Sequence, residues 1–153
     1  MKTLVTFYSR TGLTEKIANE IAKKLSCDIE QIKDLKNRKG FWGFMISGYE
    51  AVSQKLSKIA KTEKNPGEYD LVVLLSPVWA SSLSSPIRTY LFENGKKMNK
   101  VAFVATCGDN PGKIFDQMKQ LTTEPLCTFS IKESEIKSGN YYDKLDQFIE
   151  KLR

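Results

Sequence analysis

Residues 7–14 read Phe7-Tyr8-Ser9-Arg10-Thr11-Gly12-Leu13-Thr14, and they join an apolar run at residues 4–7 to an amphipathic run that begins at Leu13. This pattern predicts a buried strand, a short loop and a helix, in that order. A helix N-terminus offers N–H groups without intrahelical partners and the positive end of the helix dipole, so it can hold a phosphate. The loop adds three hydroxyls, and Gly12 would let the backbone approach an anion closely. The stretch is therefore a candidate phosphate site.

Two widespread phosphate motifs are missing from this loop. It contains neither G-x-x-x-x-G-K-[ST] nor G-x-G-x-x-G, so triphosphate and dinucleotide binding are disfavoured. A structural alternative is that Ser9 and Thr11 simply cap the helix, because hydroxyl residues are favoured at that position in any protein. The loop alone leaves both interpretations open.

The rest of the chain repeats the alternation of strand and helix. Apolar runs and helical periodicity predict strands near 3–8, 28–33, 70–76, 100–106 and 126–132, and helices near 13–25, 44–60, 84–93, 111–121 and 140–152. Such alternation predicts a parallel sheet that is covered on both faces. The unbroken apolar runs at 71–75 and 101–105 are typical of central strands, whereas the mixed run at 28–33 suits an edge.

Composition restricts the class of protein. The 153 residues are 41% hydrophobic and 27% charged, which predicts one globular domain. Arg10 interrupts the first apolar run, and no segment reaches the ~20 apolar residues of a membrane span, so we expect a cytoplasmic protein. The three cysteines, at positions 27, 107 and 127, form no disulfide or zinc pattern. Since histidine is absent, Ser-His and Cys-His dyads are excluded, and a cofactor would have to supply most of any catalysis.

Two more loops follow strands at the same predicted edge of the sheet: Ser76-Pro77-Val78-Trp79 and Thr106-Cys107-Gly108-Asp109-Asn110. With residues 7–14, they make the chain resemble the flavodoxins from residue 1 to residue 153. The resemblance implies a single domain of the α/β class over 1–153, a flavodoxin-like doubly wound sandwich. Its five-stranded parallel sheet would have the order 2-1-3-4-5, with helices on both faces. Ligands of such sheets bind at the carboxyl ends of the strands, where all three loops fall.

The same resemblance implies that the cofactor is FMN. Its phosphate would be held by the hydroxyls of Ser9, Thr11 and Thr14 and by the amides of Arg10, Gly12 and Leu13. The second loop, with Pro77, Val78 and Ala80, would place Trp79 against the flavin ring. The alternative is that Trp79 is a core residue under a turn begun by proline; the polar run Ala80-Ser81-Ser82 favours stacking.

The third loop would meet the pyrimidine edge of the flavin through its backbone amides, as the resemblance implies for Thr106, Cys107, Gly108, Asp109 and Asn110. Asp109 could also be a plain N-cap for a helix that starts at Pro111. Cys107 is expected to be an inert wall residue, because no neighbouring cation in sequence would lower its pKa.

Two features depart from the flavodoxin pattern. Many members have a glycine after the stacking aromatic, which permits a backbone flip toward N5 of the reduced flavin, whereas this chain has Ala80-Ser81-Ser82. A positive φ at a residue with a Cβ is disfavoured by roughly 1 kcal/mol or more, so the sequence supports flavin binding more strongly than it supports one-electron chemistry. The third loop also lacks the tyrosine that often covers the other ring face, so that face would be either open to a substrate or covered from elsewhere in the chain.

The net charge of +6 is concentrated in residues 36–61, which carry +5. Six basic residues stand there against the single acidic Glu50: Lys36, Arg38, Lys39, Lys55, Lys58 and Lys61. A basic surface of this kind predicts a redox partner with an acidic docking surface. No nucleic-acid reading motif accompanies the patch, so nucleic-acid binding is not expected.

The basic region also contains a dense group of apolar residues. Tyr49, Val52, Leu56 and Ile59 have helical spacing and predict a stripe that faces the core. The aromatic cluster at 41–46 would cover the flavin edge, form a dimer contact or touch an anionic membrane, in that order of preference. The chain would then be a monomer or a homodimer.

The sequence therefore predicts an FMN-binding electron-transfer protein that shuttles electrons between redox partners. The alternative is an FMN-dependent NAD(P)H or quinone oxidoreductase, an enzyme that moves two electrons at a time. A third hypothesis is a non-redox adaptor that keeps the fold and binds partners through the basic aromatic segment.

Overall fold

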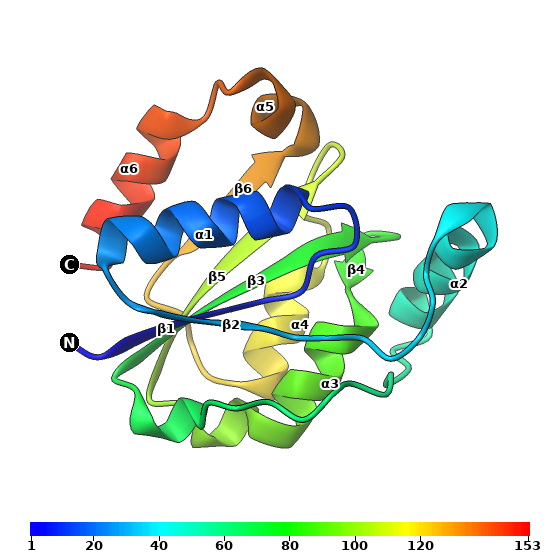
Figure 1. Ribbon diagram of the computed structural model, residues 1–153, viewed down its shortest axis with the longest axis horizontal. Helices are drawn as coiled ribbons and strands as arrows, with labels where there is room; N and C mark the ends of the chain where they lie inside the picture. The colour runs from blue at the N-terminus through cyan, green and yellow to red at the C-terminus, as the bar shows by residue number, and fades with distance from the viewer.

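The computed structural model describes residues 1–153, in which strands and helices alternate (Figure 1). The strands are β1 (Thr3–Phe7), β2 (Asp28–Gln31), β3 (Leu71–Trp79), β4 (Ser82–Leu83), β5 (Lys100–Cys107) and β6 (Thr128–Lys132). The helices are α1 (Leu13–Leu25), α2 (Gly40–Val52), α3 (Ser85–Asn94), α4 (Ile114–Leu121), α5 (Glu133–Ser138) and α6 (Tyr142–Glu150). The predicted C-terminal helix at 140–152 thus corresponds to α6, and the short α5 that precedes it was not predicted.

The five long strands form a parallel sheet in the order β2-β1-β3-β5-β6. This is the predicted order 2-1-3-4-5, because β4 is a short extra strand that pairs antiparallel with the end of β3. In the central register Val5 of β1 lies between Ile29 of β2 and Val73 of β3. The direction of the strands reverses nowhere among these five, so all their carboxyl ends meet at one edge.

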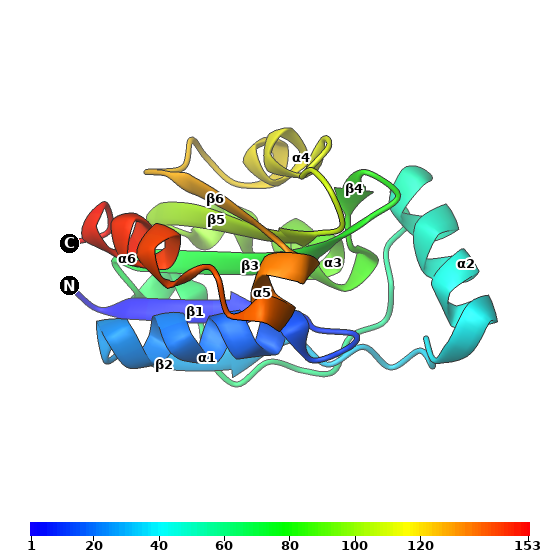
Figure 2. The same cartoon turned by 90° about the horizontal axis from the view of Figure 1, so that it is seen from above.

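Helices cover both faces of the sheet, as predicted. Figures 1 and 2 show α1 and α6 on one face and α3 and α4 on the other. Alternate residues of β3 enter the two cores: Val72 and Leu74 pack with α3 and α4, whereas Leu71, Val73 and Leu75 pack with α1 and α6. Because β3 is buried on both faces, it is apolar throughout these positions, as expected for a central parallel strand.

Helix α2 covers neither face of the sheet. It stands beyond the carboxyl ends of the strands, at one end of the molecule (Figures 1 and 2). Its buried residues are small or polar, namely Gly43, Ser47, Glu50 and Ala51. No helix of the molecule, α2 included, is long and apolar enough to cross a bilayer.

The predicted helix at 44–60 is wrong beyond residue 52. Residues 53–60 leave the helix and run beside residues 33–35, where the Ala60 N–H donates to the Lys33 carbonyl (2.8 Å) and the Leu35 N–H donates to the Lys58 carbonyl (3.0 Å). The Ser57 N–H donates to the Thr89 hydroxyl (2.8 Å). These tertiary hydrogen bonds satisfy backbone groups that a continued helix would have used.

The predicted core-facing stripe is therefore wrong as well. Tyr49 and Val52 are each 62% exposed and Leu56 is also exposed, so only Ile59 packs against the core. Tyr49 and Val52 do share one face of α2, but that face is exposed and does not pack against the core.

Two glycines of α2 provide a matched test of how closely this helix packs against the rest of the protein. A Cβ at Gly43 would lie 2.1 Å from the backbone carbon of Arg38, whereas a Cβ at Gly48 would meet only the Ala80 methyl at 3.7 Å. Gly48→Ala should raise the free energy of unfolding by about 0.5–1 kcal/mol through helix propensity. Gly43→Ala should lower it by roughly 1–3 kcal/mol, because the helix must move away from Arg38. Urea denaturation of both variants measures the difference, and equal effects would contradict this packing.

Candidate functional site

A cavity of about 750 Å³ lies at the carboxyl ends of the parallel strands. All three loops singled out from the sequence reach it, and α2 forms its outer wall. Ten of the fifteen predicted site residues line it: Arg10, Thr11, Leu13, Thr14, Pro77, Val78, Trp79, Ala80, Thr106 and Gly108. The volume is that of an ordinary small-molecule site.

The loop that precedes α1 presents unused backbone donors. Among the N–H groups of residues 10–15, only that of Gly12 donates to another group of the chain, the Ser9 hydroxyl at 3.0 Å. Gly12 has φ +96°, and nothing lies within 4 Å of the position that a Cβ would take there. Ser9 does not line the cavity, so its hydroxyl orders the loop. The open loop and its free N–H groups have the form of an anion cradle.

Thr14 connects this loop to the third one. Its hydroxyl and that of Thr106 lie 2.7 Å apart, and both side chains are buried. One hydroxyl must donate and the other accept, so the donating oxygen keeps two acceptor positions and the accepting oxygen keeps its own O–H and one acceptor position. The pair fixes the start of α1 against the end of β5 at the floor of the cavity.

Trp79 is both a core residue and a wall of the cavity. Its side chain is 8% exposed, packs edge-on against Tyr8 (5.5 Å between ring centres), and has the Arg38 guanidinium 4.9 Å from its own ring centre. Burial raises the pKa of Tyr8 to about 12, so its phenol stays neutral. Arg38 therefore occupies part of the surface that a stacked ring could use.

The turn after Trp79 has a positive φ at two residues that carry a Cβ, a conformation that is disfavoured for such residues. Ala80 and Ser81 have φ of +47° and +60°. They form a two-residue connection between the paired residues Trp79 and Ser82, and a hairpin of that length with two positive φ values is a type I′ turn. The Ser81 carbonyl accepts from the Lys113 N–H at 2.8 Å. Hairpin geometry and this bond impose the positive φ without a glycine.

The third loop contributes less to the cavity than predicted, since Cys107, Asp109 and Asn110 do not line it. Cys107 is buried, and burial raises the pKa of its thiol, in keeping with an inert residue. Asp109 is exposed and pairs with Lys132 at 3.3 Å. The N-cap of α4 is Lys113, so the alternative assignment of Asp109 as that cap is wrong. Asn110 accepts from the Gly112 N–H at 3.0 Å within the loop.

The residues of the outer wall were not among the site residues predicted from the sequence. Phe44, Met45, Ser47, Gly48, Tyr49 and Val52 of α2 line the cavity, as does Glu133 of α5. The aromatic cluster at 41–46 was the available signal, because a cover over the flavin edge was its preferred interpretation. Nothing in the local pattern around Glu133 indicated its position.

Solved structures share the fold of this chain. A flavoprotein from Lactobacillus acidophilus NCFM in complex with FMN has a TM-score of 0.73 at 21% sequence identity, over 90% of this chain and 97% of that one. A two-electron reduced flavodoxin from Megasphaera elsdenii gives 0.52 at 19% identity over 84% of each chain. A cysteine-to-serine mutant of a flavodoxin from Pseudomonas aeruginosa gives 0.57 at 11% identity over 99% of each chain.

This chain has the flavodoxin-like fold. The fold implied by the sequence resemblance is thereby confirmed. No family model and no curated protein sequence matches the chain.

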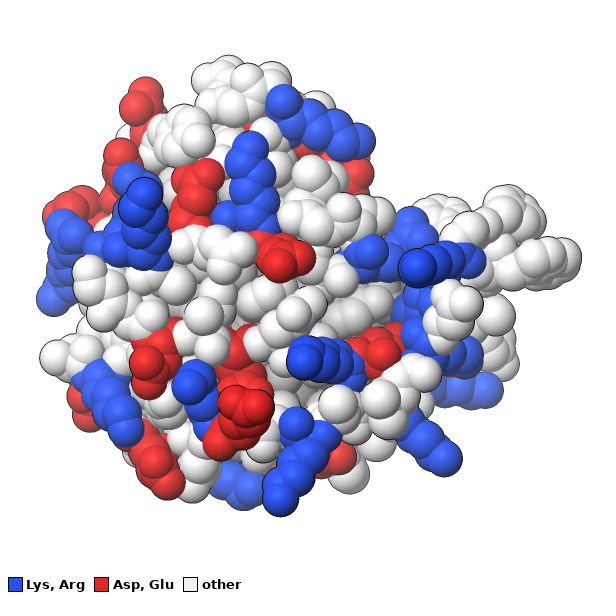
Figure 3. All heavy atoms as spheres, in the orientation of Figure 1, with Lys and Arg blue, Asp and Glu red and all other residues white.

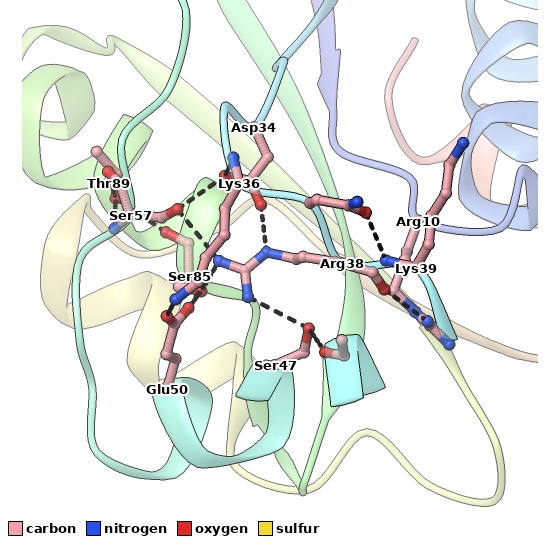
Figure 4. Close-up of polar contacts among 12 residues, drawn as sticks. Arg10, Asp34, Lys36, Arg38, Lys39, Ser47, Glu50, Ser57, Ser85 and Thr89 are labelled. Carbon is pink, nitrogen blue, oxygen red and sulfur yellow. Dashed lines mark hydrogen bonds and ion pairs between the residues drawn. The ribbon is translucent and has the colours of Figure 1, made fainter. Parts of the chain in front are cut away.

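Within this flavodoxin-like fold, a buried ionic cluster holds α2 in place (Figure 4). The Arg38 side chain is 4% exposed and directs its guanidinium toward α2 and α3. It donates to Ser47 (3.2 Å), Glu50 (2.6 Å), Ser57 (3.1 Å), Ser85 (3.1 Å) and Asp34. Lys36 donates to the other oxygen of Glu50. Two cations and two carboxylates thus neutralise each other at the inner face of α2.

The cluster changes the expected basic surface. Arg38 is buried and Lys36 is paired, so neither adds an unpaired positive charge to the surface. The remaining basic residues of the segment are exposed: Lys39, Lys55, Lys58 and Lys61. The basic patch is real but smaller than the sequence count suggested.

Glu50 makes the seating of α2 depend on pH. Burial alone would raise the pKa of Glu50, but hydrogen bonds from Lys36, Arg38 and Ser85 outweigh it and hold the pKa below its usual value. A carboxyl group with a lowered folded-state pKa stabilises the fold above its unfolded pKa of about 4.3 and loses that contribution as pH falls through the folded value. The difference in unfolding free energy between wild type and Glu50→Gln should therefore shrink below about pH 4.3.

Urea denaturation across acidic pH measures this difference. Glu150→Gln, which removes an exposed carboxylate at the end of α6, is the matched control and should follow the wild-type curve. A constant difference between wild type and Glu50→Gln would show that the carboxylate contributes nothing through its charge.

Proposed function

We propose that this chain binds FMN and transfers electrons between redox partners. The observation that carries the proposal is the set of unused N–H groups at residues 10–15, which opens onto a cavity of about 750 Å³ with apolar walls. A phosphate suits the first feature and a flat aromatic ring the second. The Lactobacillus acidophilus flavoprotein, which shares the fold, forms a complex with FMN.

The residues fit each part of this cofactor. The amides of residues 10–15 and the Thr11 hydroxyl would hold the phosphate, with Arg10 at the side of the cradle. Bound in this position, FMN would supply the electron-transfer chemistry. Pro77, Val78 and Trp79 would form one wall for the ring system, and stacking on Trp79 stays a prediction. The chain's own task is to orient the ring and to limit its contact with water.

The surface charge bears on the proposed redox partner, and the cysteines bear on the proposed location. Exposed lysines near the outer wall would favour a redox partner with an acidic docking surface, acting mainly on the association rate. The three cysteines are free thiols, which agrees with a cytoplasmic location.

Thr11 gives the sharper test of the phosphate cradle, because Thr14 is already engaged with Thr106. Thr11→Ala should weaken FMN binding by roughly 1–3 kcal/mol, since it removes a donor to a charged group. Thr11→Ala combined with Thr14→Ala should weaken binding at least as much. Quenching of FMN fluorescence on titration measures both affinities, and Thr123→Ala, an exposed threonine outside the cavity, is the control.

Unchanged affinity in the double variant would refute the phosphate assignment. A wild-type protein that purifies colourless and leaves FMN fluorescence unquenched would instead support the non-redox adaptor.

A second candidate function is a two-electron oxidoreductase for NAD(P)H or a quinone. The apolar outer wall favours it, because Phe44, Met45, Tyr49 and Val52 would offer a flat apolar substrate a surface within the same cavity. No nicotinamide fingerprint is present in the sequence, which weighs against NAD(P)H.

Stepwise anaerobic reduction of the FMN-loaded protein, followed by visible absorbance, distinguishes the two functions. A carrier should take up its electrons in two separable steps, because it passes on one electron at a time. The positive φ at Ala80 and Ser81 gives the turn after Trp79 a conformation that a glycine would adopt more readily. A single two-electron step would contradict the carrier and favour the oxidoreductase.

A further inference from the structure

Helix α2 differs from an ordinary surface helix, because its large apolar residues are exposed and its buried residues are small or polar. Its large apolar residues are exposed: Phe41 is 69% exposed and Trp42 76%, and Phe44, Met45, Ile46, Tyr49 and Val52 are exposed as well. Its inner face packs on the protein through small and polar residues. A contiguous exposed apolar surface of this kind marks a binding surface in soluble proteins. We call these seven exposed residues the α2 ridge.

A basic collar surrounds the α2 ridge. Lys39 precedes the helix and Lys55 and Lys58 follow it, all exposed, and the Lys55 ammonium lies 4.9 Å from the ring centre of Tyr49. Between residues 40 and 52 the only charged residue is Glu50, which is buried in the ionic cluster. Figure 3 shows the same division, with blue spheres where α2 meets the body and white spheres on its outer end.

The positions of the charges decide among the possible occupants. A second copy of this chain would bring one basic collar against another, because the ridge carries lysines at both ends and no exposed acidic residue. A protein partner would need a deep apolar groove to receive a ridge that stands out from the body (Figures 1 and 2). An anionic lipid surface offers both an apolar interior and a negatively charged boundary, and it adapts to a convex shape.

We propose that the α2 ridge docks this protein on an anionic lipid surface. Trp42, Phe41 and Ile46 enter the boundary between headgroups and acyl chains, while Lys39, Lys55 and Lys58 stay at the level of the phosphates. Because Phe44, Met45, Tyr49 and Val52 also line the cavity, the cavity wall lies at the membrane surface in the docked protein. The docking itself does not depend on whether FMN is bound.

Cosedimentation with vesicles tests the proposal on the full chain. Vesicles of phosphatidylcholine with phosphatidylserine should bind the protein at low salt, vesicles of phosphatidylcholine alone should bind it much more weakly, and added salt should release it. Tryptophan emission should shift to shorter wavelength on binding. Trp42→Phe should abolish that shift, since the other tryptophan, Trp79, is already buried.

Two double variants test the ridge and its collar separately. Trp42→Gln with Ile46→Gln should lower the partition into anionic vesicles by about tenfold or more for each side chain removed. Lys39→Gln with Lys55→Gln should lower it by about fivefold for each lysine. The controls are Phe92→Gln on α3 for the first and Lys23→Gln with Lys100→Gln for the second, because these exposed residues lie on other elements.

Three results would overturn the proposal. The first is no binding to anionic vesicles at low salt. The second is binding that the ridge variant and its control weaken equally. The third is a dimer in sedimentation equilibrium that dissociates in the ridge variant, with no vesicle binding, which would make the ridge an interface between copies. All three leave the FMN titration untouched, so a failure of this proposal is distinguishable from a failure of FMN binding.

Discussion

The buried guanidinium of Arg38 fixes the position of α2, and so it fixes the outer wall of the cavity. Moving an arginine out of water is costly, and only well-placed partners offset that cost. Here the partners come from four places in the chain: Asp34 before the arginine, Ser47 and Glu50 on α2, Ser57 after it, and Ser85 at the start of α3. Since each of these bonds has a direction, the cluster specifies where α2 lies more sharply than apolar contact would.

This electrostatic attachment explains why the large apolar residues of α2 can face outward. An ordinary surface helix holds to its domain by burying such residues, which leaves them unavailable for anything else. In this chain Gly43 and Ala51 allow close approach, the ionic cluster supplies the specific contacts, and the aromatic residues remain free. Four residues of the α2 ridge also line the cavity, so a ligand in the cavity and a surface bound to the ridge act on the same helix.

The sequence predicted the sheet, its strand order and the loops at its carboxyl edge, because unbroken apolar runs such as residues 71–75 and 101–105 have few other structural uses. It failed at α2 for a specific reason. Helical spacing shows which residues share a face, as Tyr49 and Val52 do, but it does not show which face is inward. That choice depended on Arg38 meeting Glu50 and Asp34, contacts that no local pattern encodes. The end of α2 at Val52 and the type I′ turn at Ala80 and Ser81 were likewise set by distant partners, Thr89 for the first and Lys113 for the second.

The floor and the outer wall of the cavity therefore rest on different physical forces. The floor consists of strand ends and of the Thr14–Thr106 pair, and the two apolar cores beneath it hold it in place. The wall rests on charges whose attraction depends on the protonation of Glu50. A change that neutralises Glu50 weakens the attachment of α2 while it leaves the burial of Val73 and Leu75 untouched. The cradle at residues 10–15 can thus persist when α2 is displaced. Binding of an anion at the floor is therefore separable from the covering of a ligand by α2.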